Sequence, residues 1–537
     1  MSVQIVTDNS SITKPASRVM LGGILSLIGS LASNVVVAYI YGAGSSMDAY
    51  LTAIVIPSYL QIVFFSSLAF VVIPIFIEAE TTSHVEDAWA LVGTFFWLTA
   101  IALLLIAILG AVFSRAIIEL VAPGFQDEKS ALASQMLSIL IFTIPFIGLS
   151  TLTAGIQNVR HRYFWPSVAP AFGSLINVVI LVTLSPILGS IVLCWGYLLA
   201  MVVQSGFSII PVFSHGWKRL LPLTDERVQM AGRSMVPLIL FGMFTCISPV
   251  ALRYFSSTLP DGQIAYMGYA NKISSIFVVL FASGIAASIF PAMARTFAQD
   301  GISGLSQKSD FGLRLTFAVA LPAIMIVNSV AIPLISVFFE RGAFSHSDTY
   351  SVGRILLAFL IGEVLIRMIA NVFERGFYTL KNTLTPPIVG AFFVILFIAT
   401  ARFFVTRWGY VGIVWANVIR QGLDALTMGT LLFAKFPKGH AKNMIESIMR
   451  YFMAAFASFL CGRLALFTLA SSSVYIQLTL GGFVGVLLYF LILYFIDRKM
   501  LASIFEMFGI LRIFASFEAR VNLLSQRMSW LVGRIRQ

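Results

Sequence analysis

Charge is scarce in this sequence. Only 11% of the 537 residues are Asp, Glu, Lys or Arg, whereas soluble globular proteins carry about 25%. In place of charge, 59% of the residues are hydrophobic, and the mean hydropathy is +0.93. This composition excludes a soluble globular protein and predicts a polytopic membrane protein. The net charge of +12 needs no nucleic-acid partner, because basic residues gather in the cytoplasmic loops of membrane proteins.

Cysteine and histidine are also scarce. The three cysteines, Cys194, Cys246 and Cys461, lie in apolar segments, and the five histidines are scattered singly. This spacing offers no disulfide framework and no set of metal ligands. We therefore expect no metal and no cofactor, apart from a coupling ion or the membrane potential.

Motifs for catalysis and for secretion are absent as well. The chain contains no G-x-x-x-x-G-K-[S/T] sequence, no paired carboxylates of glycosidase character and no Ser/His/Asp pattern. The longest connection, around 214–233, leaves no room for a soluble catalytic domain, so we expect that the protein is not an enzyme. Residues 1–18 lack the layout of a signal peptide and are interpreted as a cytoplasmic N-terminus.

Long uncharged runs are the dominant feature of the chain. A run of about 20 apolar residues crosses the roughly 30 Å hydrocarbon core of a bilayer as a helix. The weakest run is 351–373, because it holds Arg354, Glu363 and Arg367. The sequence predicts an all-α polytopic membrane protein with about 14 transmembrane helices. The expected helices cover 19–41, 49–77, 88–112, 131–157, 164–186, 190–213, 234–256, 266–294, 313–338, 351–373, 384–405, 410–434, 448–470 and 475–496.

Lysine and arginine are unevenly divided between alternate loops. If the N-terminus lies inside, the cytoplasmic loops hold 17 of them and the basic tail holds more, while the outer loops hold 7. The outer set is Arg115, Lys129, Arg253, Arg341, Arg402, Arg407 and Arg463. The positive-inside rule therefore predicts that both termini are cytoplasmic.

An internal repeat divides most of the chain into two halves. Phe64, Ser66, Ala69 and Pro74 recur as Phe281, Ser283, Ala286 and Pro291; Gly155, Arg160 and Pro166 recur as Gly376, Lys381 and Pro387; Gly189 and Trp195 recur as Gly409 and Trp415. The three offsets are 217, 221 and 220 residues. We predict two pseudo-symmetric six-helix lobes, 19–213 and 234–434, with substrate bound between them.

The remaining segments lie outside the duplication. Residues 448–496 are expected to form two C-terminal helices. The tail 497–537 places apolar residues at helical spacing with arginines between them, which predicts a basic amphipathic cytoplasmic helix on the inner leaflet. The alternative for this tail is a solvated helix packed on the protein.

Lys272 is the charge that most indicates a function. It lies inside the otherwise uncharged run 266–291, where a lysine costs several kcal/mol unless it faces a bundle interior or a water-filled cavity. The alternative is that its long stem lifts the ammonium to the headgroup layer. We favour a cavity, and the thin, distributed polar groups around it suit a large amphipathic substrate.

Two expected helices carry further charge on one face. Spacings of three and four residues align Glu363, Arg367, Asn371 and Glu374 on one helix and Asn417, Arg420, Gln421 and Asp424 on another. Glu363, Arg367, Arg420 and Asp424 are candidates for gating or ion coupling, and a buried ion pair that fixes helix packing is an equal alternative for them. Ser26, Ser30, Ser33 and Asn34 also share one face, where small polar residues are more often helix contacts than ligands.

Several motifs resemble one bacterial family. The segment 41–78 begins YGAGSSMDAY and ends VVIPIFIE, VAPGF lies at 121–125, ERGAFSHSD at 340–348 and GFYTLKNTLTPP at 376–387. Together with 156–170 and 269–298, these motifs resemble the MviN/MurJ family of lipid II flippases, of the multidrug/oligosaccharidyl-lipid/polysaccharide exporter superfamily. They cover nearly the whole chain in the family's order.

The resemblance implies two six-helix lobes around a cationic cavity that binds a lipid-linked diphosphate sugar. It also implies alternating access across the bacterial inner membrane, cell-wall or surface-glycan biogenesis, and a monomer in contact with membrane lipids. Glycan-synthesis enzymes are possible partners, and no nucleic acid is expected.

This sequence differs from the family at the positions of the family's essential arginines. Their positions on the first two helices hold Leu27, Ser33 and Gln61, and the family's Y-A-D-R ends here as Asn271-Lys272. Lysine lacks the bidentate fork of arginine. Either the headgroup differs from that of lipid II, as in an exopolysaccharide precursor, or other cations, Arg253, Arg354, Arg367 and Arg420, take over.

The candidate cavity residues follow from these positions. They are Lys272, Asn271, Gln61, Ser33, Asn34, Asp48 and Arg253, where Asp48 is the aspartate of the family's G-A-G-x-x-x-D motif. Two other functions compete: a non-transporting membrane scaffold for glycan synthesis, and a multidrug exporter of the same superfamily. A membrane-embedded glycosyltransferase is disfavoured, because no outer loop is large enough for sugar chemistry.

Overall fold

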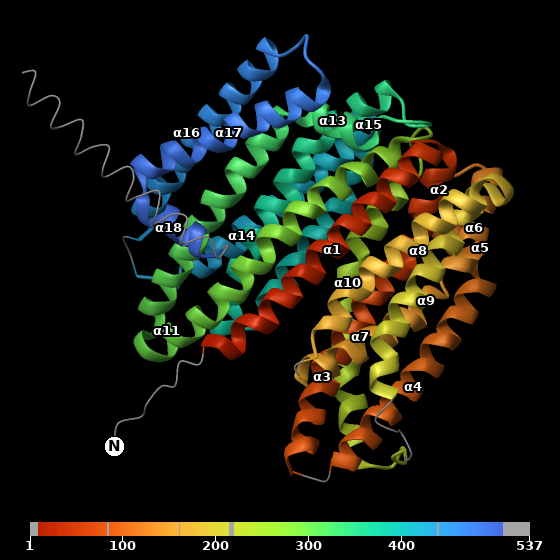
Figure 1. Cartoon of the computed structure of the whole chain (residues 1–537). Coiled ribbons are helices and arrows are strands. Elements are labelled where there is room, and N and C mark those ends of the chain that lie inside the picture. The colour runs from red at the N-terminus through yellow and green to blue at the C-terminus, as the bar shows by residue number, and fades with distance from the viewer. Residues whose placement is uncertain (1–8, 83–84, 161, 214–219, 438–439, 508–537) are drawn as a thin grey trace, which may run out of the picture. The chain divides into compact units, whose positions relative to one another are not determined.

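The computed structural model describes residues 9–82, 85–160, 162–213, 220–437 and 440–507 (Figure 1). In these ranges helices are the only regular secondary structure, which confirms the all-α class. Eleven helical segments of the described chain are long and apolar enough to cross a membrane. Two of them, Phe164–Val212 and Thr385–Phe433, each contain two of the expected helices, so the count of fourteen stays a prediction.

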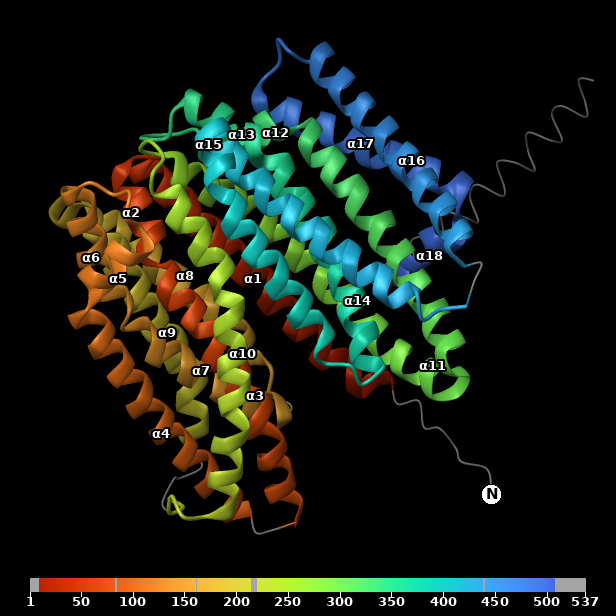
Figure 2. The same ribbon diagram turned by 180° about the vertical axis from the view of Figure 1, so that it is seen from behind.

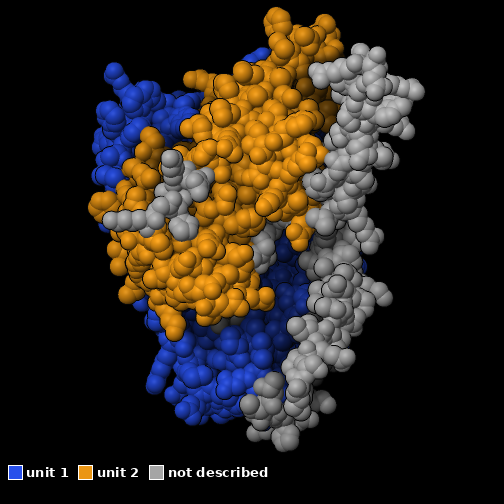
Figure 3. Space-filling model, turned by 90° about the vertical axis from the view of Figure 1, so that its left-hand side faces the viewer, with its two compact units in different colours: residues 1–268, 338–351, 394–416 blue, residues 269–337, 352–393, 417–537 orange. Residues whose placement is uncertain are grey.

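The chain divides into two compact units, coloured separately in Figure 3. Unit 1 consists of residues 1–268, 338–351 and 394–416, and unit 2 of residues 269–337, 352–393 and 417–537. These units are a different division from the two lobes expected from the repeat, whose boundaries stay a prediction. Residues 508–537, most of the expected amphipathic tail, lie outside the described residues.

Unit 1 holds the first ten α-helices. They are α1 (Asn9–Tyr41), α2 (Ser45–Ala53), α3 (Val55–Thr82), α4 (Val85–Val112), α5 (Ser114–Val121), α6 (Asp127–Leu140), α7 (Thr143–Val159), α8 (Phe164–Leu188), α9 (Val192–Phe213) and α10 (Glu226–Ser256). The short 3-10 helix η1 (Gly189–Ile191) lies between α8 and α9. The short helices α2, α5 and α6 gather at one end of the unit (Figures 1 and 2).

Small residues allow α1, α8 and α9 to pack closely. A Cβ atom on Gly22 of α1 would lie 2.5 Å from the Cβ of Ser167 on α8, and one on Gly173 of α8 would lie 2.8 Å from the carbonyl oxygen of Ala200 on α9. The Ser26 hydroxyl donates to the Ser167 carbonyl at 2.9 Å. Close approach through Gly, Ala and Ser is the usual contact between membrane helices, which have no hydrophobic driving force between them.

Two apolar clusters fill the interior of unit 1. One contains Phe76 of α3, Leu91 of α4 and Leu152 of α7. The other contains Ile118 of α5 and Met136 of α6, with their neighbours on α2 and α4. The second cluster fixes the start of α6 beside α2, where a group of buried charges lies.

Unit 2 takes most of the later helices. They are α11 (Gln263–Ser329), α12 (Ala331–Phe339), α13 (His346–Phe359), the π-helix η2 (Leu360–Ile366), α14 (Arg367–Thr379), α15 (Thr385–Phe433), α16 (His440–Thr468), α17 (Val474–Ile496) and α18 (Arg498–Met507). The first residues of α11 and α13, the last two of α12 and the middle of α15 belong to unit 1. Helices α16 and α17 lie side by side (Figures 1 and 2), and the Tyr489 hydroxyl of α17 donates to the Ala318 carbonyl of α11 at 2.6 Å.

The backbone supports the repeat at its clearest glycine pair. Gly189, between α8 and α9, has φ 60° and ψ −141°, and Gly409, inside α15, has φ 59° and ψ −143°. Both conformations suit glycine, because a Cβ is disfavoured at positive φ. The two glycines that the sequence aligns at an offset of 220 therefore make the same turn between two apolar helices.

Candidate functional site

Buried charges meet at one end of unit 1, in what we call the outer-end cluster, because the positive-inside rule predicts that its loops face outside. It comprises Asp48 of α2, Lys129 of α6, Asp261, and the backbone amides of Gly262 and Ala265 at the start of α11. The Lys129 ammonium donates to Asp48 Oδ2 at 2.9 Å and to Asp261 Oδ1 at 2.7 Å. The amides of Gly262 and Ala265 each donate to the Asp48 carboxylate at 2.7 Å. Three separate parts of the chain are thus joined through one carboxylate and one ammonium.

The central pair of this cluster is shielded from solvent. The Asp48 side chain is 0% exposed and that of Lys129 is 9% exposed, whereas Asp261 is 64% exposed. The ammonium of Lys129 also lies 4.5 Å from the centre of the Phe125 ring, a favourable cation–π distance. Burial raises the pKa of the Asp48 carboxyl above its ordinary value, while Lys129 and the two amides act in the opposite direction.

The start of α11 is shaped to accept the Asp48 carboxylate. The first amides of a helix have no partner within the helix and carry the positive end of its dipole. Gly262 precedes α11 with φ 87°, and a Cβ on it would lie 2.4 Å from the Ala43 carbonyl oxygen. Only glycine fits this position without strain, and Asp48 caps the helix from a distant part of the sequence.

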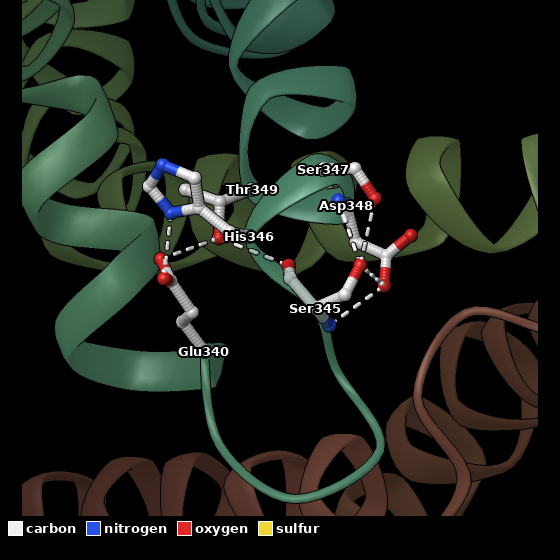
Figure 4. Close-up of polar contacts among 6 residues, drawn as sticks. All are labelled: Glu340, Ser345, His346, Ser347, Asp348 and Thr349. Carbon is white, nitrogen blue, oxygen red and sulfur yellow. Dashed lines mark hydrogen bonds and ion pairs between the residues drawn. The ribbon is translucent and has the colours of Figure 1, made fainter.

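A tight turn between α12 and α13 belongs to the same unit (Figure 4). Glu340 lies 2.6 Å from His346 Nδ1 and accepts from the Thr349 hydroxyl at 2.9 Å. Asp348 caps the start of α13 by accepting from the Ser345 amide and hydroxyl, both at 2.8 Å. The polar groups of this turn are therefore bonded mainly to one another.

This turn also contacts the loop between α1 and α2. The Ala343 amide donates to the Tyr39 carbonyl at 2.8 Å, and Gly42 is so close to Ala343 that a Cβ on it would lie 2.3 Å from the Ala343 carbonyl oxygen. The Tyr266 hydroxyl of α11 donates to Asp348 at 2.9 Å. With the outer-end cluster, these contacts bring four loops of unit 1 together, all predicted to face outside. They are 42–48, 113–130, 257–265 and 339–350.

Other predicted site residues of unit 1 lie on α1, α3 and α10. Arg253 of α10 is half-buried and lies within electrostatic reach of Tyr59 and Asp48. Gln61 of α3 is also half-buried. Ser33 is buried, and its hydroxyl accepts from the Asn177 amide of α8 at 2.8 Å. The Asn34 amide donates to the Ser30 carbonyl of its own helix at 2.8 Å. Ser33 and Asn34 are thus engaged in helix contacts, and a binding role for any of the four stays a prediction.

In unit 2, Lys272 and Asn271 are both exposed on α11. Within the described chain, the Lys272 ammonium has neither a carboxylate nor a hydrogen-bond partner. An uncompensated ammonium in an apolar helix is costly in lipid, so this position fits a side chain that meets water or an anionic ligand.

The second charged group of unit 2 we call the charge square: Glu363 on η2, Arg367 on α14, and Arg420 and Asp424 on α15. Glu363 and Arg367 form an ion pair at 2.8 Å. The amide of Gln421 lies 3.5 Å from the other oxygen of Glu363. Arg420 lies within electrostatic reach of both Glu363 and Asp424. The structure therefore brings these four predicted residues together.

Packing explains the alternation of charge in the square. Glycine contacts pair residues 362 with 418, 366 with 422, 373 with 429 and 376 with 432. Because the offset is 56 at every contact, the two helices run parallel and in register. At this offset Arg420 lies one residue beyond the level of Glu363, and Asp424 lies one residue beyond the level of Arg367, so that each charge has an opposite charge near its own level on the neighbouring helix.

Contacts within the charge square are incomplete. One carboxylate oxygen of Asp424 is buried and has no hydrogen-bond partner, and Arg420 bonds through its Nε to Asn417 at 3.1 Å. Glu374, two turns after Arg367 on α14, adds a carboxylate close to Asp424. The π-helix η2 widens the backbone where Glu363 lies, a feature often found at functional sites.

Sequence reasoning counted Lys129 only as an outer-loop charge and did not single out Asp261. A signal for Lys129 was present, because it stands in the first turn of α6 after Asp127 and Glu128, where the helix dipole disfavours a cation. A basic residue in that position needs a compensating carboxylate.

Comparison with known sequences identifies relatives across most of the chain. The family model described as "Lipid II flippase MurJ" matches residues 37–516. A probable lipid II flippase MurJ of Vibrio cholerae is 27% identical over 447 residues, which cover 78% of this chain and 82% of the relative. The lipid II flippase MurJ of Burkholderia cenocepacia is 25% identical over 448 residues, covering 80% and 84%.

Solved structures share the fold. A structure titled "Lipid II flippase MurJ, inward closed conformation" matches with a TM-score of 0.76 at 22% identity, over 90% of this chain and 99% of that one. An inward-facing multidrug resistance MATE family transporter matches with a TM-score of 0.63 at 16% identity, over 76% and 95%. At these identities the likeness concerns the fold alone.

Proposed function

Because this chain belongs to the lipid II flippase MurJ family, we propose that it moves an undecaprenyl-diphosphate-linked glycan precursor from the cytoplasmic to the outer leaflet of the bacterial inner membrane. Lipid II is the first candidate, since it is the substrate that the relatives' names state. A related lipid-linked oligosaccharide is the second. The protein acts as a transporter, with no chemical conversion of the substrate.

The observation that carries the proposal is Lys272. It is a cation inside an apolar helix, exposed, and without a partner in the described chain. A phosphate or diphosphate supplies the missing negative charge and accepts hydrogen bonds from the ammonium. Asn271 beside it, and Arg253 and Gln61 on other helices, are the further polar groups proposed to line the cavity.

Ser33, Asn34 and Asp48 have a smaller part in the proposed binding site. Their polar atoms are already bonded within the protein. We assign Ser33 and Asn34 to the wall of the cavity, and Asp48 to the closure of its outer end. Leu27, Ser33 and Gln61 at the positions of the family's arginines leave fewer donors for a diphosphate. Either other cations, such as Arg253 and Arg420, supply the missing donors for lipid II, or the headgroup differs from that of lipid II.

Transport is proposed to occur by alternating access. We propose that the chain has fourteen transmembrane helices, arranged as two six-helix lobes with two further helices, and that both termini are cytoplasmic. The contacts among the predicted outer loops in unit 1 fit a state closed on the outside. The charge square supplies ionisable groups within the membrane for gating or for coupling to an ion, since such groups mark ion pathways and relays in transporters.

The protein is proposed to work as a monomer among membrane lipids, with glycan-synthesis enzymes as neighbours. A multidrug exporter is the alternative transporter, favoured by the fold shared with MATE proteins. A non-transporting scaffold would be expected to lose its membrane-embedded charges, because idle charges are costly there.

Binding of the purified protein to undecaprenyl-diphosphate lipids with different sugars, measured by native mass spectrometry, tests the proposal. The Lys272→Ala variant is expected to lose about tenfold or more in affinity, since a hydrogen bond to a charged group contributes about 1.5–3 kcal/mol. Lys499→Ala, which removes an exposed lysine of α18, is the matched control and should bind normally.

Complementation decides the headgroup. Growth of a bacterium depleted of its own lipid II flippase, when it expresses this chain, would support lipid II as substrate. Binding of diphosphate lipids without complementation would indicate another glycan. The absence of any diphosphate-lipid binding would overturn the proposal in favour of the scaffold or the multidrug exporter.

A further inference from the structure

Asp48 and Lys129 together form a docking surface for the start of α11, which we call the socket. Asp48 on α2 and Lys129 on α6 present one negative and one positive group 2.9 Å apart. The segment at the start of α11 presents the reverse order, with the negative Asp261 followed by the positive end of a helix. Lys129 meets Asp261 at 2.7 Å, and Asp48 meets the helix amides at 2.7 Å. The two surfaces are complementary at both points.

The two halves of this contact are built differently. Helices α2 and α6 pack directly on each other, and both contribute to one apolar cluster. The start of α11 packs on α2 through an apolar contact, where a Cβ on Gly268 would lie 2.4 Å from Leu51. It also makes directional polar contacts, through the socket and through the bond from Tyr266 to Asp348. The polar contacts therefore fix the position at which the start of α11 docks on the α2–α6 pair.

We propose that Lys129 is a positioning residue that sets how tightly the outer end of the protein closes. It holds the Asp48 carboxylate in place and binds Asp261, so that the start of α11 docks as a latch. This inference rests on the proposed alternating-access function, because it assigns the latch to the outer gate.

The position of Lys129 supports a dedicated role. In the first turn of α6 its charge opposes the helix dipole, and its burial beside Phe125 removes it from water. Both effects are unfavourable unless carboxylates compensate them. When the latch opens, Lys129 keeps one carboxylate, Asp48, and loses the other, Asp261, so that opening strands no buried charge.

The test uses thiol accessibility from outside the cell. Ala265 belongs to the latch and is fully buried in the docked state, so an Ala265→Cys variant should react slowly with a membrane-impermeant thiol reagent. Thr258→Cys, at an exposed position of the same loop, should react quickly in every background and confirms that this loop faces outside. The chain without an introduced cysteine gives the background of its three native cysteines.

Two substitutions then probe the latch. Asp261→Ala leaves the Asp48–Lys129 pair intact and is expected to raise labelling at Ala265→Cys about threefold, as for the loss of a partly exposed ion pair. Lys129→Met removes both contacts and is expected to raise it about tenfold or more. Lys129→Arg, which keeps the charge, should restore slow labelling in part. Thermal melting in detergent checks that each variant is folded.

The outcomes separate the latch from the flippase function. Faster labelling at Ala265→Cys with unchanged labelling at Thr258→Cys supports the latch, even if no lipid is transported. Unchanged labelling in folded Asp261→Ala and Lys129→Met proteins would overturn it, even if lipid transport is found. Slow labelling at Thr258→Cys would place this end inside and overturn the assignment to the outer gate.

Discussion

The outer-end cluster and the charge square are both small groups of carboxylates and cations, yet they are built differently. In the outer-end cluster a fully buried carboxylate receives three hydrogen bonds between 2.7 and 2.9 Å. In the charge square one ion pair is short, one amide contact measures 3.5 Å, and a buried oxygen of Asp424 has no partner. The buried carboxylate of the outer-end cluster is thus fully hydrogen-bonded, whereas the charge square contains a buried oxygen that could still accept a hydrogen bond.

This difference indicates two kinds of role. A fully satisfied polar network rigidifies the structure around it, whereas an unsatisfied one leaves alternative pairings open. In the charge square, Arg420 lies near both Glu363 and Asp424, so that the cations and carboxylates have more than one possible partner. We therefore propose that the outer-end cluster holds its three segments rigidly together, whereas the charges of the charge square exchange ion-pair partners. The following substitutions test this difference.

Asp48→Ala should have the largest effect on stability. It leaves the ammonium of Lys129 buried with only Asp261 and removes the cap of α11. Loss of one partner from a buried pair costs about 3–5 kcal/mol, so thermal melting in detergent should show a severely destabilised protein. Asp261→Ala, at an exposed position, should cost about 1 kcal/mol or less. Equal effects of the two substitutions would contradict the assigned difference.

Glu363→Gln should instead reduce transport and spare stability. It removes one charge of the square, which blocks the exchange of partners, while the amide keeps the size of the side chain. We expect transport to fall about tenfold or more, with a change in stability of about 1 kcal/mol. The control is Glu446→Gln, which breaks an exposed ion pair of the same spacing with Arg450 and should leave transport unchanged. A stability loss in Glu363→Gln as large as that of Asp48→Ala would favour a packing role.

Gly262→Ala tests the close fit at the start of α11. Its cost combines backbone strain of about 1–2 kcal/mol at positive φ with a clash against the Ala43 carbonyl. Gly301→Ala is the matched control, because Gly301 has φ 61° but open space around it. Gly262→Ala should lower the melting temperature more than Gly301→Ala, because only Gly262 adds a clash to the strain of a positive φ. No difference would mean that the start of α11 yields to the added methyl group.

Asp225→Ala should have the smallest effect. Asp225 caps α10 by accepting from the Arg227 amide at 2.9 Å, and its carboxylate also accepts from the Arg227 side chain. A lost cap costs about 1 kcal/mol. The hydrogen bonds from Arg227 hold the pKa of Asp225 below its ordinary value. This stabilisation is therefore present above the ordinary aspartate pKa and disappears as the pH falls through the lowered one. Melting temperatures of the two proteins should converge in acid, and a constant gap would contradict the cap.

The sequence predicted what depends on neighbouring residues. Apolar runs gave the helices, a charge inside such a run singled out Lys272, and helical spacing aligned Glu363 with Arg367. The repeat also identified Gly189 and Gly409 as equivalent positions, which have the same backbone conformation.

Contacts between distant residues could not be predicted in this way. Lys129 lies 81 residues from Asp48 and 132 from Asp261, and nothing in the local sequence selects these partners. Ser33 shows the same limit, because its match to an arginine position suggested a ligand, whereas its hydroxyl bonds to Asn177 on α8. The register between η2, α14 and α15 likewise depends on glycine contacts that only the fold reveals.

Lipid translocation in proteoliposomes tests the central claim most directly. An undecaprenyl-diphosphate disaccharide is placed in the membrane, and its arrival in the opposite leaflet is followed with an impermeant sugar-modifying enzyme. We predict translocation by the native chain, strong loss in Lys272→Ala and normal activity in Lys499→Ala. Equal translocation by native and Lys272→Ala proteins, or none by the native chain with any diphosphate-linked glycan, would contradict the account.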